Sequence, residues 1–179
     1  MTTGGVVPAD ETLAYEVPKA NLPLADSPLA FRDRVVKNWQ SAELVRLIIN
    51  QPDKPQVMLS RTVSRVDEQA KPGSWTLQGH EKFEPFAVDE LIKQLTPIKA
   101  QDWLTQAPAW SADSKLKELQ ITLSDDTQHT LKVNPTDRSA LLGGMDAAFV
   151  ITPELLTALQ AEFAKSSSSI TPAPALPMP

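Results

Sequence analysis

The hydrophobic pattern of residues 116–163 predicts strand, tight turn, strand, loop, strand and helix in that order. Apolar and polar residues alternate on both sides of Ser124–Thr127, four residues that favour turns. The apolar members of this alternation are Leu119, Ile121, Leu123, Leu131 and Val133. The pattern is typical of a β-hairpin. A short apolar run at 147–151 then indicates a strand buried on both faces.

A helix is predicted to begin directly after that run. Thr152 can cap it, Pro153 fits a first helical position, and Glu154 lies where the helix dipole favours negative charge. The apolar residues that follow fall close to one side of the helix, so we expect it to pack on the sheet. These residues are Leu155, Leu156, Leu159 and Phe163.

The earlier part of the chain has a similar pattern. Ser41 can cap a short helical turn, which leads into a strand with the apolar residues Val45, Leu47 and Ile49. A turn follows at 52–55, and a partner strand then runs through Val57, Leu59 and Val63. We expect 65–73 to be an exposed loop, 75–77 a short strand and 100–104 a return to the sheet. A helix between them is predicted from apolar residues spaced i, i+3, i+4, i+7 and is ended by Pro97. Its apolar residues are Val88, Leu91, Ile92 and Leu95.

These elements predict an α+β fold of antiparallel strand units, with helices packed on one face of the sheet. The order strand, acidic turn, strand occurs at 44–59 and again at 116–133, which indicates two related units. Residues 13–18 also match 147–152, so the first unit would open with the end of an upstream unit. The predicted organisation is a flexible N-terminus (1–12), a first unit (13–105), a linker (106–114), a second unit (115–165) and a disordered Ser/Pro-rich tail (166–179).

Composition narrows the classes of partner. The formal net charge is −5 and the sequence pI is about 5.0, which argues against a nucleic-acid or anionic-membrane surface. Cysteine is absent, so disulfides and thiol chemistry are excluded while the redox compartment stays open. No apolar run approaches the roughly 20 residues that span a bilayer, so we expect no direct membrane insertion by this chain.

The residues that usually carry chemistry do not form a recognisable motif. His80 and His129 lack the spacing of metal ligands, and Asp125–Asp126 fits a solvated turn better than a calcium loop. Gly143–Gly144 has no phosphate-loop frame, and no Gly-x-Ser-x-Gly sequence occurs. We therefore expect no catalytic residue, cofactor or metal site.

Two features could serve binding. In Arg32-Asp33-Arg34, strand alternation would place both arginines on one face to grip a carboxylate or phosphate; we favour an ion-paired positioning element. The tryptophans could form a sugar-stacking surface, but their scatter favours packing. They are Trp39, Trp75, Trp103 and Trp110.

The spacing of several segments resembles a known family. The segments are Phe31–Arg34 with the strand-forming run after it, Trp75–Leu77, the helix through Leu91 and Leu95, the strand Phe149–Ile151 and the helix at Leu155–Leu156. Together, across residues 13–163, they resemble the bacterial family known as domain of unknown function 4340. The resemblance implies an envelope-associated protein of repeated α+β units on the periplasmic side, with any membrane anchor outside this chain, and some members resemble accessory proteins of ABC transporters. It implies no catalytic residues.

The sequence thus predicts a non-catalytic interaction or scaffold module of a longer envelope protein, and not an enzyme. Its partner would be a protein or its own upstream unit, with Arg32, Asp33 and Arg34 as candidate interaction residues. The alternative is a ligand-binding module for a glycan or peptide, for which clustered tryptophans would be the mark. An enzyme without a recognisable motif is third.

Overall fold

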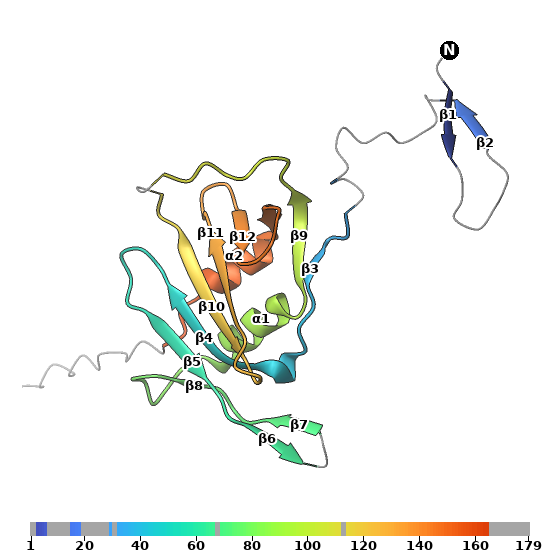
Figure 1. The fold of residues 1–179 in the computed structure, drawn as a ribbon. Helices are drawn as coiled ribbons and strands as arrows, with labels where there is room; N and C mark the ends of the chain where they lie inside the picture. The colour runs from blue at the N-terminus through green and yellow to red at the C-terminus, as the bar shows by residue number, and fades with distance from the viewer. Residues whose placement is uncertain are drawn as a thin grey trace, which may run out of the picture. The chain divides into compact units, whose positions relative to one another are not determined.

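The computed structural model describes residues 3–6, 15–18, 29, 32–66, 69–111 and 114–164, and divides the chain into two units, Met1–Arg32 and Asp33–Pro179. In the first unit, β1 (Thr3–Val6) and β2 (Tyr15–Pro18) pair as an antiparallel ribbon (Figure 1). β2 falls within residues 13–18, the segment matched above to the predicted strand at 147–151, whereas β1 lies where no strand was predicted. The predicted flexible segment falls mostly outside the described residues, and the predicted disordered tail falls wholly outside them.

The second unit is built on a nine-stranded antiparallel sheet with the order β3-β9-β13-β12-β11-β10-β4-β5-β8 (Figure 1). Its strands are β3 (Val35–Lys37), β4 (Leu44–Asn50), β5 (Val57–Ser60), β8 (Thr76–Leu77), β9 (Ile98–Trp103), β10 (Lys117–Leu123), β11 (Gln128–Val133), β12 (Ser139–Leu142) and β13 (Phe149–Ile151). Two helices, α1 (Pro85–Leu95) and α2 (Pro153–Gln160), accompany the sheet. The fold is therefore mixed α+β, as predicted.

Within the sheet β4 pairs antiparallel with β10, with Leu47 opposite Ile121 and Ile49 opposite Leu119. This pair joins the two predicted units in one sheet. β10 and β11 form the predicted hairpin, and Asp126 adopts a left-handed conformation (φ 65°) in its turn. Whether the two units are related stays a prediction.

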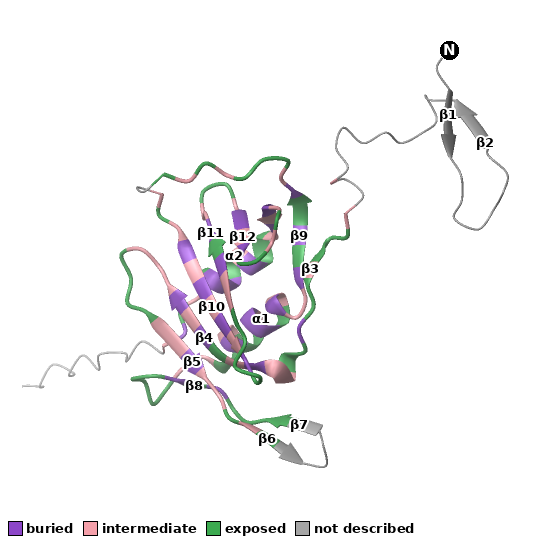
Figure 2. Cartoon of the chain, viewed as in Figure 1, coloured by how far each residue is buried: buried purple, intermediate pink, exposed green. Residues whose placement is uncertain are grey.

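Burial alternates along the central strands, so one side of them is buried and the other meets solvent (Figure 2). The predicted apolar residues of α1 are all buried, and α1 contacts both α2 and β9. In α2 the Thr152 hydroxyl accepts a hydrogen bond from the Leu155 amide at 3.3 Å, which confirms the predicted cap. Leu155 and Leu159 are buried, but Leu156 is only half-buried.

Three local predictions differ from the structure. The expected loop at 65–73 contains most of a hairpin, β6 (Val63–Val66) with β7 (Gln69–Pro72), whose main-chain ladder needs no apolar alternation. Ser41 is not the cap of the short 3₁₀ helix η3 (Ser41–Glu43); instead the Glu43 carboxylate accepts from the Gln40 amide at 2.7 Å. In β13, Val150 is half-buried, so that strand is not buried on both faces.

None of the helices in the described ranges combines the length and the apolar character needed to cross a membrane.

Candidate functional site

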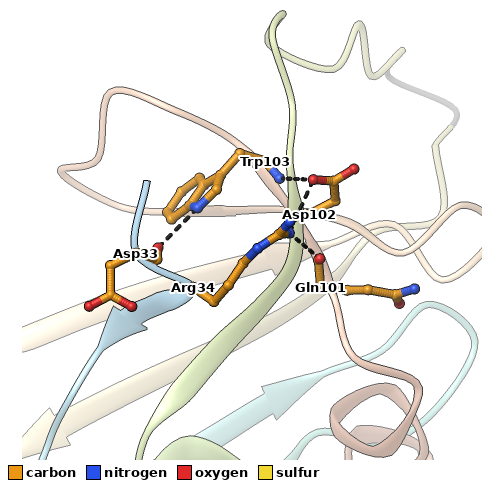
Figure 3. Close-up of polar contacts among 5 residues, drawn as sticks. All are labelled: Asp33, Arg34, Gln101, Asp102 and Trp103. Atoms are coloured by element: carbon orange, nitrogen blue, oxygen red, sulfur yellow. Dashed lines mark hydrogen bonds and ion pairs between the residues drawn. The ribbon is translucent and has the colours of Figure 1, made fainter. Parts of the chain in front are cut away.

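Asp33 and Arg34 of the predicted charged segment directly precede the edge strand β3, and Arg34 reaches its neighbour β9 (Figure 3). The Arg34 Nη1 atom is 3.1 Å from Asp102 Oδ1 and also donates to the Gln101 carbonyl. The Ala100 amide donates to the Arg34 carbonyl at 2.7 Å. Arg34 is thus bound to β9 by both its side chain and its main chain.

Asp33 is held in a similar way. Its carbonyl accepts a hydrogen bond from Trp103 Nε1 at 3.0 Å (Figure 3). Its carboxylate accepts a hydrogen bond from the Val35 amide at 2.9 Å. Trp103 is buried, with its ring 5.7 Å from that of Phe149. Asp33 and Arg34 therefore fasten β3 to β9. Arg32 belongs to the first unit, where its amide donates to the Leu29 carbonyl at 3.1 Å.

These contacts fit an ion-paired element that positions β3 better than they fit an anion-binding site open to a ligand. The Arg34 and Asp102 side chains are 49% and 68% exposed, and an ion pair in such solvent contributes about 0–1 kcal/mol. A role for Arg32, Asp33 and Arg34 in partner binding stays a prediction.

The two histidines lie in different surroundings. His80 is exposed in the turn after β8, while His129 on β11 is half-buried with its ring 5.0 Å from that of Trp39. Burial, and secondarily the charge of Lys37, lower the pKa of His129, and Asp125 opposes this. Over the described ranges, no group of three or more histidine and acidic side chains is arranged to hold a metal ion.

The remaining polar candidates have local roles. In the β10–β11 turn the Asp125 carboxylate accepts from the Thr127 amide at 2.9 Å, and hydrogen bonds from Thr127 lower the pKa of Asp125. Gly143 and Gly144 form the turn after β12, where Gly144 has a φ of 84°. Both pairs act in turns in this structure.

The tryptophans do not share one surface. Trp39 contacts His129, Trp75 lies under the Arg61 guanidinium, and Trp103 contacts Phe149. Trp110 donates from Nε1 to the Ser139 hydroxyl at 3.1 Å. Each of these contacts joins a tryptophan to a residue of another type, which does not fit the clustered tryptophans expected of a glycan-stacking surface.

A groove that the sequence did not predict lies between α1 and α2. It has a volume of about 460 Å³. Its walls are mostly small or apolar, and two carboxylates line it; the lining residues are Phe86, Ala87, Glu90, Pro153, Glu154, Thr157, Ala158 and Ala161. Phe86 is 73% exposed. One signal could have revealed it: Phe86 precedes Val88 by two positions, which places it on the opposite side of the helix from the buried residues.

A larger cavity, of about 700 Å³, lies along a different face of α1. It contains Arg61 and Trp75, with Val88, Ile92 and Lys93 of α1 in its lining. Nothing in the sequence indicates this grouping, because Arg61 lies in no motif and packing was favoured for Trp75 over a sugar-stacking role.

Comparisons of the chain with family models, with curated proteins and with solved structures found no significant match. They leave the resemblance to domain of unknown function 4340 as a prediction, and the function has to be argued from the surfaces themselves.

Proposed function

We propose that this protein is a non-catalytic interaction module that binds a protein partner in the groove between α1 and α2. The observation that carries the proposal is Phe86, a large apolar side chain left 73% exposed beside an apolar groove. Exposed apolar surface gathered in a concavity is a common mark of a protein-binding site. Among the residues whose burial the structure describes, the other exposed large hydrophobic side chain is Val35, at 37%.

The groove has the composition expected of a helix-binding site. Ala87, Ala158 and Ala161 have short side chains, so another helix could approach closely, and Phe86 offers an aromatic anchor. The carboxylates of Glu90 and Glu154 make the lining negative, in keeping with the net charge of −5. The partner segment that fits is therefore an amphipathic helix with apolar residues on one side and Lys or Arg beside them.

Site-specific photo-crosslinking tests the proposal. The full chain carrying a benzoyl-phenylalanine at position 86 is incubated with a bacterial envelope extract, and the crosslinked partner and its contact segment are identified by mass spectrometry. That partner is then purified for titration. We expect the contact segment to be a basic amphipathic helix, the substitution Phe86→Ser to weaken binding by at least about tenfold, and added salt to weaken it further.

Val35→Ser is the matched control, since it removes the second exposed hydrophobic side chain without touching the groove. Phe86→Ser should leave the melting temperature almost unchanged, because the side chain is mostly in water already. A partner whose affinity is unaffected by Phe86→Ser would contradict the proposed site. If Val35→Ser alone abolished binding, the partner would be adding a strand beside β3 instead.

A ligand-binding module is the second candidate function. The separate positions of the tryptophans speak against a glycan surface. The cavity at Arg61 favours a ligand with a negative group, such as a peptide end. An enzyme stays the third reading.

We also infer that the sheet is formed by two related units with both helices on one face. Three observations support this. First, β4 and β10 pair with each other, and each leads through a turn that contains an Asp with φ 65° (Asp53, Asp126) into its other neighbour, β5 or β11. Second, each half then continues to a helix. Third, α1 contacts α2. An envelope location, a longer parent protein and an ABC-transporter association rest on the family resemblance alone, and the crosslinked partner would test them.

A further inference from the structure

The cavity beside α1 has the size and the composition of a ligand site. Its volume of about 700 Å³ lies within the range of roughly 300–1,000 Å³ that is usual for small-molecule sites. Trp75 is 9% exposed and Val88 1%, and together with Phe83 and Ile92 they give the lining an apolar part. Its polar side chains are Ser41, Arg61, Ser74, Asp89, Lys93 and Thr96, and they should influence which ligand fits.

Arg61 is the most constrained of these polar groups. Its Nε donates to the Leu44 carbonyl at 2.7 Å, and its Nη2 donates to the Ser41 carbonyl. The guanidinium carbon lies 4.6 Å from the centre of the Trp75 ring. The head group is therefore fixed on the cavity wall before any ligand arrives, and Nη1 has no hydrogen bond to any described residue.

The charge of Arg61 lacks a counter-ion within the described part of the chain. The ion pairs found there are Arg34–Asp102, Lys93–Glu90 and Lys115–Asp53, and none involves Arg61. Arg61 is half-buried, and burial lowers its pKa. A partly desolvated cation without a carboxylate partner gains more from an incoming anion than an exposed cation does.

The local backbone brings these groups together. The Gly73 amide donates to the Thr62 carbonyl at 2.8 Å, which holds the segment before Trp75 against the residue that follows Arg61. A Cβ at position 73 would lie 2.9 Å from the Thr62 hydroxyl oxygen, too close without a shift. Glycine at this position therefore allows the approach that places Trp75 beneath Arg61.

The lining favours one negative charge over two. Besides Arg61, it contains Lys93, which is already 3.4 Å from Glu90, and one acidic residue, Asp89. A phosphate dianion would meet a single free cation and a nearby carboxylate. A carboxylate needs only one guanidinium, which can bind both of its oxygens, and the apolar walls can take the group attached to it.

We infer that this cavity binds a carboxylate attached to an apolar group, either a small organic acid or the C-terminal end of a peptide, with Arg61 as its anion-binding residue. The site is independent of the groove at Phe86, because the two concavities have no lining residue in common. Failure of one proposal would leave the other standing.

Paired probes test the inference on the full, unmodified chain. The first pair is phenylacetate and its neutral analogue phenylacetamide; the second is the peptide acetyl-Gly-Ala-Phe as the free acid and as the amide. Binding is followed by ¹⁵N NMR at the Trp75 indole N–H and the Gly73 amide. We expect at least one acid to bind and shift both signals, with its amide at least about tenfold weaker, since the amide cannot form charge-assisted hydrogen bonds to Arg61.

The two pairs separate the sources of the carboxylate. Preference for the peptide acid identifies a peptide C-terminus, and preference for phenylacetate identifies a small acid. Arg61→Gln should weaken binding of the acid by at least about tenfold, whereas Arg138→Gln, a change at a half-buried arginine outside the cavity, should not. If Arg61→Gln fails to fold, Arg61→Lys should weaken binding, since lysine cannot bind both oxygens from one planar group. Equal shifts by acid and amide, unchanged binding in the Arg61 variants, or no shift with any probe would overturn the inference.

Discussion

Replacing Leu91 by alanine is the most direct test of the packing described above. Leu91 lies on the buried side of α1 with 0% of its surface exposed. The substitution removes about three methylene-sized groups, worth about 2.4 kcal/mol at about 0.8 kcal/mol each. The cavity left behind adds to this, because a packed core relaxes only in part. We therefore expect the free energy of unfolding to fall by about 3–4 kcal/mol, within the range measured for buried leucines.

A matched pair in α2 gives the internal control. Leu155 is 1% exposed, so Leu155→Ala should cost about as much as Leu91→Ala. Leu156 is adjacent in sequence but only half-buried, so Leu156→Ala should cost about 1–1.5 kcal/mol. From the sequence, Leu156 was expected to face the core as Leu155 does. Unequal losses for the two variants would support the burial found in the structure, and equal losses would support the expectation from helical spacing.

Urea denaturation followed by circular dichroism measures all three variants, with an unchanged slope as the sign that only stability has changed. For a chain of 179 residues, each kcal/mol corresponds to about 2–4 °C, so Leu91→Ala should lower the melting temperature by roughly 6–16 °C. Two results would refute the reasoning: a loss below about 1 kcal/mol for Leu91→Ala, or equal losses for Leu155→Ala and Leu156→Ala.

Two further predictions concern pH and backbone conformation. Burial, and after it the charge of Lys37, lower the pKa of His129 in the folded state, while Asp125 opposes this. The stability that the neutral ring contributes is therefore complete above the unfolded pKa of about 6.5. It is lost as the pH falls toward the lower pKa of the folded state. Urea titrations at pH ~7 and ~5.5 should show this loss, and His129→Gln should reduce it; an unchanged loss would contradict the assignment. Gly144→Ala should lower the free energy of unfolding by about 1 kcal/mol, because Gly144 has a φ of 84°. Gly143→Ala should lower it clearly less, since a Cβ at position 143 would lie an ordinary 3.5 Å from the nearest atom. Equal losses in thermal melts would contradict this.

The parts of the fold that could be predicted are those whose signals lie in neighbouring residues. The β10–β11 hairpin needed only alternation on both sides of a polar turn, and α2 needed only Thr152-Pro153-Glu154 before an apolar run. α1 combined correct spacing with a proline stop. In each case a few adjacent residues determine the hydrogen bonds and the buried side.

The features that could not be predicted depend on contacts between distant residues. β9 follows α1 in sequence yet lies between β3 and β13, and nothing within Ile98–Trp103 specifies those two neighbours. The β6–β7 hairpin is a local exception: its sequence lacks the apolar alternation that predicts a half-buried strand, while its ladder is formed by main-chain groups. Leu156 lies about 100° around the helix from Leu155, and how far the buried side of α2 extends toward it depends on what the rest of the chain places there.

The same distinction explains which part of each candidate site is visible in the sequence. Phe86 could have been singled out, because a large apolar residue opposite the stripe formed by Val88 and Leu91 has no place in the core that α1 covers. The groove itself could not, because α2 forms its other wall. Arg61 shows the opposite case: an isolated arginine is unremarkable in a sequence, and only the folded chain places it on Trp75 with its charge unpaired among the described residues. For α1, the spacing of apolar residues in the sequence therefore specifies the side that faces the core. Whether its other sides line a binding site depends on the elements that pack beside them.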